Sequence, residues 1–149
     1  HYSLSMSSFP QDINYYKNEA HNLAVEENIK LLPRVSLSEL AIYQKAFDIL
    51  LMPFPDTEHY RYYMSPLKMF EYMASGRPII ASDLPSVRDI LNDKNCLFVK
   101  AGDPDDLAEK ILKLAGDLSL GERLAGQAYY DVKEHTWKKR AEKILKFIG

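Results

Sequence analysis

The feature that most constrains the fold of this chain is an alternation of short apolar runs with segments of helical period. The runs lie at residues 28–32, 48–53, 78–82 and 96–100, with an earlier candidate at 2–6. The run at 48–53 is mostly apolar rather than alternating, which is typical of a parallel strand covered on both faces. Repeated strand–helix–strand units need crossover connections. The sequence therefore predicts an α/β fold, with a Rossmann-like parallel sheet and helices on both of its faces.

Helix start signals separate these runs. Residues 36–39 and 119–122 both match the capping box, in which a serine and a glutamate three positions later satisfy each other's free backbone donors. Asp103 followed by Pro104 and two further acids indicates another helix start, with a capping carboxylate and a proline at the first helical position.

Beyond Val99 the pattern changes to three consecutive helices without an intervening strand. Thr136 is the expected cap of the last helix. Apolar residues follow it at helical spacing and form a stripe that is more typical of a core than of a ligand site, although not all of it need pack on this domain. The members of this stripe are Trp137, Ala141, Ile144 and Ile148.

Length and composition favour an ordinary globular chain, which we expect to form one domain over residues 1–149. The formal net charge of -2 gives no electrostatic reason to expect nucleic acid as a partner. No apolar run approaches the roughly 18 residues that a membrane span needs. The single cysteine, Cys96, opens an apolar run and is expected to be buried, which fits a cytoplasmic location. The four histidines are scattered without ligand spacing, so we expect no zinc site.

The junction after the run at 48–53 is the strongest candidate for a binding site, because parallel sheets bind ligands where strands end. A long aromatic loop leads from there to a predicted helix in which Ser65 caps and Pro66 occupies the first turn. Lys68 in that first turn opposes the helix dipole. An anion at the same end would reverse this cost, since backbone N–H groups and the ammonium would both face it. The alternative is a capped helix with a solvated lysine.

Glu71 lies one turn further along this predicted helix, at the edge of its apolar stripe. A carboxylate there could accept hydrogen bonds from the two hydroxyls of a ribose. The alternative is a surface glutamate paired with Lys68 at three-residue spacing. Gly76 is expected to end the helix. The stripe itself comprises Pro66, Met69, Phe70, Met73 and Ala74.

The segment 65–82 reads SPLKMFEYMASGRPIIAS and strongly resembles the signature of retaining GT-B glycosyltransferases of the sucrose-synthase-like group. In that family a helix of the form lEymA-x-GkPvia runs into a strand. The flanking sequences AFDILLMP at 46–53 and VKAGDPDDLA at 99–108 resemble further family segments in the right order. The similarity covers about residues 28–149.

This resemblance implies that the chain is part of the donor-binding, C-terminal domain of such an enzyme, with a nucleotide sugar as its partner. Glu71 then corresponds to the second glutamate of the family's Glu-x7-Glu motif and binds the ribose. Tyr63 stands where the first glutamate is expected, so Arg61, Tyr63 or His59 is a candidate to take over contacts to the sugar. The diphosphate would meet backbone N–H groups near Leu67. The full set of donor-binding residues that we expect is Glu71, Lys68, Leu67, Pro66, Ser65, Tyr63, Arg61, Val35 and Arg34.

The resemblance also implies that the chain begins near the family's third strand, without the acceptor domain and the upstream phosphate clamp. We therefore expect no catalytic residue that can be named with certainty in this chain, and no transfer activity from it alone. A glycan or a lipid-linked acceptor would bind through the other domain. Peripheral membrane association of the full-length enzyme is left open.

Four further interpretations compete with this one. Residues 103–105 match the Asp-x-Asp of metal-dependent glycosyltransferases, but they sit where a helix needs caps, so we expect neither a metal nor another cofactor. No Gly-x-Gly-x-x-Gly follows a strand, which argues against a nicotinamide-binding domain. The remaining alternatives to a transferase are one half of a nucleotide-sugar 2-epimerase and a non-catalytic nucleotide-binding or assembly module.

Overall fold

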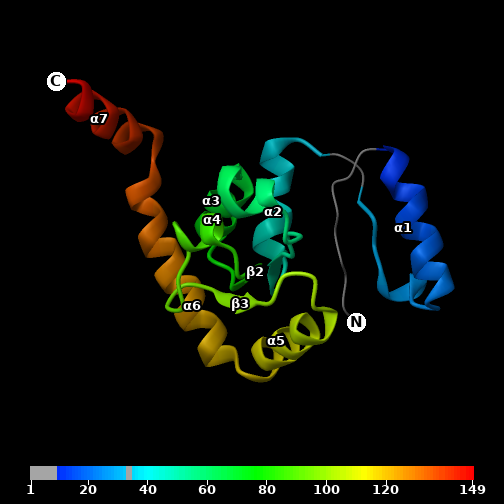
Figure 1. Ribbon diagram of the computed structural model, residues 1–149. Coiled ribbons are helices and arrows are strands. Elements are labelled where there is room, and N and C mark those ends of the chain that lie inside the picture. Colours follow the sequence, from blue (N-terminus) through cyan, green and yellow to red (C-terminus); the bar gives the residue numbers. More distant parts are fainter. Residues whose placement is uncertain (1–9, 33–34) are drawn as a thin grey trace. The chain divides into compact units, whose positions relative to one another are not determined.

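The computed structural model describes residues 10–32 and 35–149 (Figure 1). The chain divides into two compact units, one that ends at Leu40 and one that begins at Ala41. The grouping of the whole chain as one domain stays a prediction.

The first unit contains the helix α1 (Pro10–Asn22), the short 3-10 helix η1 (Glu26–Asn28) and the start of α2 (Leu37–Ala46). The strand predicted over 28–32 is wrong, because Asn28 ends η1 and residues 29–32 carry no regular structure. An apolar run becomes a strand only through ladder hydrogen bonds to a neighbour, and the run itself does not encode that neighbour. The earlier candidate strand at 2–6 lies outside the described residues.

The capping box predicted at the start of α2 is confirmed. The carboxylate of Glu39 accepts hydrogen bonds from the backbone N–H of Ser36 at 2.9 Å and from its hydroxyl at 2.7 Å. In return the backbone N–H of Glu39 donates to Ser36 Oγ at 3.3 Å. These bonds satisfy donors that the first turn of a helix leaves free.

The second unit is built on a three-stranded parallel sheet in the order β1-β2-β3. Its strands are β1 (Leu50–Met52), β2 (Ile79–Ser82) and β3 (Leu97–Val99). Each strand falls within one of the predicted apolar runs at 48–53, 78–82 and 96–100. The register pairs Met52 with Ala81 and Ala81 with Phe98, so these three side chains share one face of the sheet.

Helices cover both faces of this sheet, which confirms the predicted α/β architecture. One face packs Met52 and Ala81 against Met69 and Met73 of α3. The other face packs Ile80 against Leu114 of α5 and against α6. The elements outside the sheet are η2 (His59–Tyr63), α3 (Leu67–Ser75), α4 (Pro85–Arg88), α5 (Pro104–Gly116), α6 (Leu118–Asp131), η3 (Val132–His135) and α7 (Trp137–Ile148).

Three α-helices follow β3, as predicted, but one of their starts differs from expectation. Asp103 caps α5 by accepting a hydrogen bond from Asp106 N at 3.1 Å, and Thr136 Oγ1 caps α7 in the same way. The capping box predicted over 119–122 is wrong. Asp117 caps α6 instead and accepts from Leu120 N at 2.9 Å, because a carboxylate just ahead of Ser119 reaches the same free donors.

The apolar stripe of α7 does not lie in the core, contrary to the prediction. Trp137 is 74% exposed, and Ile144 and Ile148 are also exposed. Helical spacing shows that apolar residues share a face, but it carries no information on what that face contacts.

Two predictions about burial and membrane insertion can be compared with the described residues. Cys96 is buried just before β3, and burial raises the pKa of its thiol to about 12. Within residues 10–32 and 35–149, none of the helices has the length and apolar character that crossing a membrane requires.

Candidate functional site

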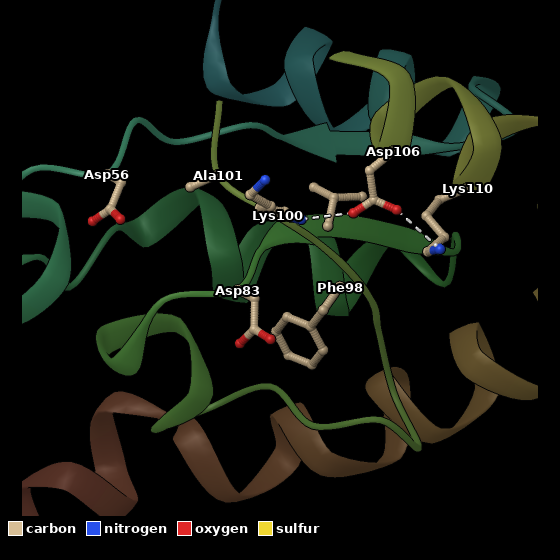
Figure 2. Close-up of a pocket in the computed structure, with 8 residues that line it drawn as sticks. Asp56, Asp83, Phe98, Lys100, Ala101, Asp106 and Lys110 are labelled. Atoms are coloured by element: carbon tan, nitrogen blue, oxygen red, sulfur yellow. Dashed lines mark hydrogen bonds and ion pairs between the residues drawn. The ribbon is translucent and has the colours of Figure 1, made fainter. Parts of the chain in front are cut away.

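Two hollows open where the strands of the sheet end. The larger, of about 490 Å³, is lined by residues that follow β1, β2 and β3, among them Asp56, Asp83 and Lys100 (Figure 2). The smaller, of about 300 Å³, adjoins it beside Pro53 and Pro104. This is the edge at which an open parallel sheet usually binds ligands.

The carboxylates that line the larger hollow are already paired with cations. Asp106 accepts a hydrogen bond from the backbone N–H of Lys100 at 2.7 Å and pairs with Lys110 Nζ at 3.0 Å. The backbone bond from Lys100 is the main cause that lowers the pKa of Asp106. Asp83 pairs with Arg88, which holds the pKa of that carboxyl below its usual value. Because these carboxylates are paired, the hollow presents little unpaired negative charge to a ligand.

The start of α3 differs in this respect. Pro66 occupies the position before the first helical residue and has no N–H, and no side chain caps the helix. Ser65 was predicted to cap, and that prediction is wrong, because Pro66 rather than Ser65 stands next to Leu67. Among the described residues no acceptor is found for the backbone N–H of Leu67 or Lys68. Free donors at a helix N-terminus, with an exposed lysine beside them, suit an anion.

Glu71 is half-buried one turn further along α3. Gln44 of α2, which is only 6% exposed, donates a hydrogen bond from Nε2 to Glu71 Oε2 at 3.4 Å. The alternative of an ion pair between Glu71 and Lys68 is not found in the described structure. Lys68 Nζ lies instead 6.0 Å from the ring centroid of Tyr72. Burial, and secondarily Glu71, raise the pKa of the Tyr72 phenol. Since the 3.4 Å bond from Gln44 is the only hydrogen bond found for the Glu71 carboxylate among the described residues, this carboxylate keeps acceptor capacity for a ligand.

The buried side of α3 agrees with the predicted stripe at Met69 and Met73, with Phe70 packed beside them. Ala74 is exposed, and Tyr72, which is not a member of the predicted stripe, packs against the core. The helix ends at Gly76, which adopts the left-handed conformation with φ 72°. This confirms the predicted stop, since glycine takes that conformation without strain.

The long loop between β1 and α3 is held to β2 and to α4 by two buried serines, Ser82 and Ser86. Ser82 Oγ donates to the carbonyl of Phe54 at 2.7 Å, and Ser86 Oγ donates to the carbonyl of Tyr60 at 2.5 Å. The rings of Phe54 and Tyr60 stack with their centroids 5.3 Å apart. The loop holds its place through these contacts, and η2 forms a π-helical turn within it.

The other predicted donor-binding residues differ in their surroundings. Arg61, in η2, forms a two-pronged ion pair with Asp56, in which Nη2 donates to Oδ2 at 2.8 Å. Its charge is therefore already engaged, and this pair lowers the pKa of Asp56. Tyr63 is exposed, as is Leu67. Val35 is half-buried in the first unit, and Arg34 lies outside the described residues.

Sequence reasoning did not identify Gln44 or the two serines. Gln44 lies in α2, 27 positions before Glu71, and only the folded chain brings the two together. A lone glutamine among apolar residues carries no signal for this contact. Ser82 ends the apolar run at 78–82, and Ser86 lies in the short helix α4. Neither position indicates a hydrogen bond to the loop.

Comparison with known proteins identifies the family. The family model described as "Glycosyl transferases group 1" matches residues 8–117. The chain belongs to this family. The matched region includes the whole sheet and α3, so it contains the predicted donor-binding residues.

A named relative extends this match. The chain is 26% identical over 133 residues to the alpha-monoglucosyldiacylglycerol synthase of Streptococcus pneumoniae. The alignment covers 89% of this chain and 29% of that protein. The chain thus spans less than a third of the length of this relative.

Solved structures of other proteins share the fold. The sucrose-phosphate synthase of Thermosynechococcus elongatus aligns with a TM-score of 0.82 at 20% sequence identity, over 98% of this chain and 37% of that one. Anabaena Alr3699/HepE, in complex with UDP-glucose, aligns with a TM-score of 0.71 at 17% identity, over 84% of this chain and 33% of that one. The GT-B assignment of the fold is thereby confirmed.

Proposed function

We propose that this chain is the nucleotide-sugar-binding part of a two-domain glycosyltransferase that transfers a sugar with retention of its anomeric configuration. The observation that carries the proposal is the start of α3. There the N–H groups of Leu67 and Lys68 have no acceptor among the described residues, the Lys68 side chain is exposed, and Glu71 follows one turn later. This order of groups matches the order of diphosphate and ribose in a nucleotide sugar.

The donor in this proposal is a nucleoside diphosphate sugar. Its diphosphate meets Leu67 and Lys68, and its ribose hydroxyls donate to Glu71. The UDP-glucose bound to the Anabaena protein supports a donor of this chemical class. Ser65, Pro66, Arg61 and Tyr63 complete the proposed donor site. Arg34 and Val35 stay predicted donor-binding residues, because the family resemblance implies that the base lies near the loop at 33–37.

The chemistry follows from where charge develops. When the bond between the sugar and the diphosphate breaks, negative charge accumulates on the leaving diphosphate. The positive end of α3 and the Lys68 ammonium stabilise that charge. In this proposal the chain provides no nucleophile and requires neither a metal nor another cofactor.

The acceptor in this proposal is a glycan or a lipid-linked molecule bound by a domain that this chain does not include. The Streptococcus relative is named an alpha-monoglucosyldiacylglycerol synthase, which supports a lipid acceptor. Peripheral association of the full-length enzyme with a membrane stays a prediction. A cytoplasmic location stays a prediction.

The test compares Lys68→Ala and Glu71→Gln in the full-length enzyme by calorimetric titration with UDP and with uridine, and with the GDP and ADP pairs. Lys68→Ala should weaken binding of the diphosphate more than that of the nucleoside, since it removes a charge next to the phosphates. Glu71→Gln should weaken both alike, by about 1–3 kcal/mol, through loss of charge-assisted hydrogen bonds.

Matched controls are Lys113→Ala and Glu122→Gln, which make the same changes at exposed positions of α5 and α6. Both should bind nucleotide as the unaltered enzyme does. If Glu71→Gln binds normally but unfolds at a lower temperature, Glu71 is structural and the proposed site is wrong. If no nucleotide of the panel binds the unaltered enzyme, the chain acts as an assembly module instead.

A further inference from the structure

Two buried hydroxyls contact the loop that leads from β1 into α3. Ser82, the last residue of β2, is 1% exposed, and Ser86 in α4 is 7% exposed. Ser82 Oγ donates to the carbonyl of Phe54 at 2.7 Å, near the start of the loop. Ser86 Oγ donates to the carbonyl of Tyr60 at 2.5 Å, within η2. Both buried donors are therefore satisfied by the same segment, which belongs neither to the sheet nor to α4.

Contacts within the loop close its turn but do not fix that turn on the sheet. The backbone N–H of Arg61 donates to the carbonyl of Thr57 at 2.8 Å, and the guanidinium of Arg61 pairs with Asp56. These contacts join residues of the same turn, and an exposed ion pair contributes little to stability. The rings of Phe54 and Tyr60 pack against the core, but apolar contact has no preferred direction. The orientation of η2 therefore depends on the directional hydrogen bond from α4.

The orientation of η2 bears on the candidate site because α3 begins shortly after it. Residues 64–66 alone separate η2 from Leu67. Met64 packs against the core, and Pro66 has a φ of -74°, which its ring restricts. A link this short and this constrained passes the placement of η2 on to the first turn of α3. The direction in which the N–H groups of Leu67 and Lys68 face follows from that placement.

We propose that Ser82 and Ser86 are positioning residues of the donor site. They hold the loop between β1 and α3 in the shape that directs the N–H groups of Leu67 and Lys68 toward the diphosphate, and neither hydroxyl contacts the donor. This role rests on the proposed function, since it concerns the same site. A loop that is already ordered need not be ordered at the expense of binding free energy. When the loop is displaced in a fraction of the molecules, the apparent affinity falls accordingly.

The first test is calorimetric titration of full-length enzyme variants with UDP and with uridine, and with the GDP and ADP pairs. Ser86→Ala should weaken binding of the diphosphate by about threefold to tenfold, since it removes one buried hydrogen bond. Binding of the nucleoside should change by less than about twofold, because the displaced N–H groups face the phosphates. Ser82→Ala should act in the same direction, with a loss of at least about twofold. Ser86→Thr keeps the hydroxyl and should restore most of the affinity for the diphosphate.

Ser75→Ala is the matched control, because it removes the same kind of bond from the other end of α3. Ser75 Oγ donates to the carbonyl of Tyr72 at 2.6 Å and is half-buried. Whatever it loses in thermal stability, this variant should bind the diphosphate as the unaltered enzyme does. A loss of diphosphate affinity in Ser75→Ala equal to that in Ser86→Ala overturns the proposal, since general destabilisation would then explain both.

Hydrogen exchange over residues 57–64 measures the order of the loop itself. Without nucleotide, these amides should be protected in the unaltered enzyme and should exchange faster in Ser86→Ala, and UDP should restore much of the protection. Exchange at the same rate in both proteins overturns the proposal. Should Ser86→Ala not fold, Ser82→Ala decides the question, and unchanged diphosphate affinity in that folded variant overturns the proposal as well.

The same titrations separate this proposal from the proposed function. If the unaltered enzyme binds a nucleoside diphosphate and the folded Ser86→Ala variant binds it equally well, the positioning role alone is wrong. If the unaltered enzyme binds no nucleotide of the panel, the proposed function is wrong and the positioning role is wrong with it.

Discussion

Gln44 Nε2 donates a hydrogen bond to Glu71 Oε2 across 3.4 Å, from a side chain that is almost completely buried. The contact joins α2 to α3 and restricts the orientation of the carboxylate. A buried amide can take this role because its own position is fixed by the packing around it.

Gln44→Leu should therefore weaken binding of both nucleoside and nucleoside diphosphate, by about 0.5–1.5 kcal/mol, because the carboxylate of Glu71 loses the bond that orients it. Calorimetric titration of the full-length enzyme measures this. Gln127→Leu is the matched control, since Gln127 donates to Asp131 on α6 at 2.7 Å. Unchanged nucleotide affinity in Gln44→Leu would contradict a positioning role.

Nucleotide binding should not depend on a divalent metal. The only Asp-x-Asp of the sequence begins at Asp103, whose carboxylate is engaged by the backbone N–H of Asp106 at 3.1 Å and by Lys100 Nζ at 3.5 Å. The same backbone bond lowers the pKa of Asp103. Affinity for UDP, GDP or ADP should survive treatment with a chelator. A large loss that manganese or magnesium restores would show that this prediction is wrong.

The 149-residue chain by itself should transfer no sugar at a useful rate. It covers 29% of the length of its Streptococcus relative, and a transferase must orient donor and acceptor together. Product formation from UDP-glucose is measured with the pure chain and with the full-length enzyme on the same acceptor. Turnover by the chain alone would place the acceptor site within these residues.

Asn95→Ala should lower the free energy of unfolding by about 2–3 kcal/mol. Asn95 is fully buried, accepts from Asn92 N at 2.8 Å and donates to Asp131 Oδ2 at 2.8 Å, so its replacement removes both hydrogen bonds from a buried position. Urea unfolding measures the change. Asn92→Ala, at an exposed position, should cost under about 1 kcal/mol. Equal costs at the two positions would show that burial is not the cause.

Cys96 should resist thiol reagents at pH 8 until the chain unfolds. Burial raises the pKa of its thiol to about 12, so the reactive thiolate is scarce in the folded state. Because the unfolded chain releases this proton at a lower pH, the stability contributed by the neutral thiol should fall as pH rises from about 9 toward 12. Labelling with and without urea checks the first expectation. Rapid labelling of the folded chain would mean that the β3 edge opens easily.

Much of this fold is determined by interactions between residues close together in the sequence. The apolar runs at 48–53, 78–82 and 96–100 form the three parallel strands, and Asp103 and Gly76 begin and end helices as predicted. Caps and strand periodicity depend on neighbours within about four positions, which the sequence lists directly. The family motif over 65–82 likewise indicates α3 from consecutive residues alone.

Where two local signals compete, the sequence alone does not decide between them. Asp117 rather than Ser119 caps α6, and Pro66 rather than Ser65 precedes α3. Which residue stands at the N-cap position depends on the backbone angle at which the chain enters the helix. Packing at both ends of the connection sets that angle.

Tertiary structure alone decides the contacts that matter most for the candidate site and its surroundings. The bond between Gln44 and Glu71 and the exposure of the apolar stripe of α7 cannot be read from spacing. A periodic pattern states which side chains of one element share a face. Which partner covers that face, and at what distance, depends on segments far apart in the chain that meet only when the whole unit folds.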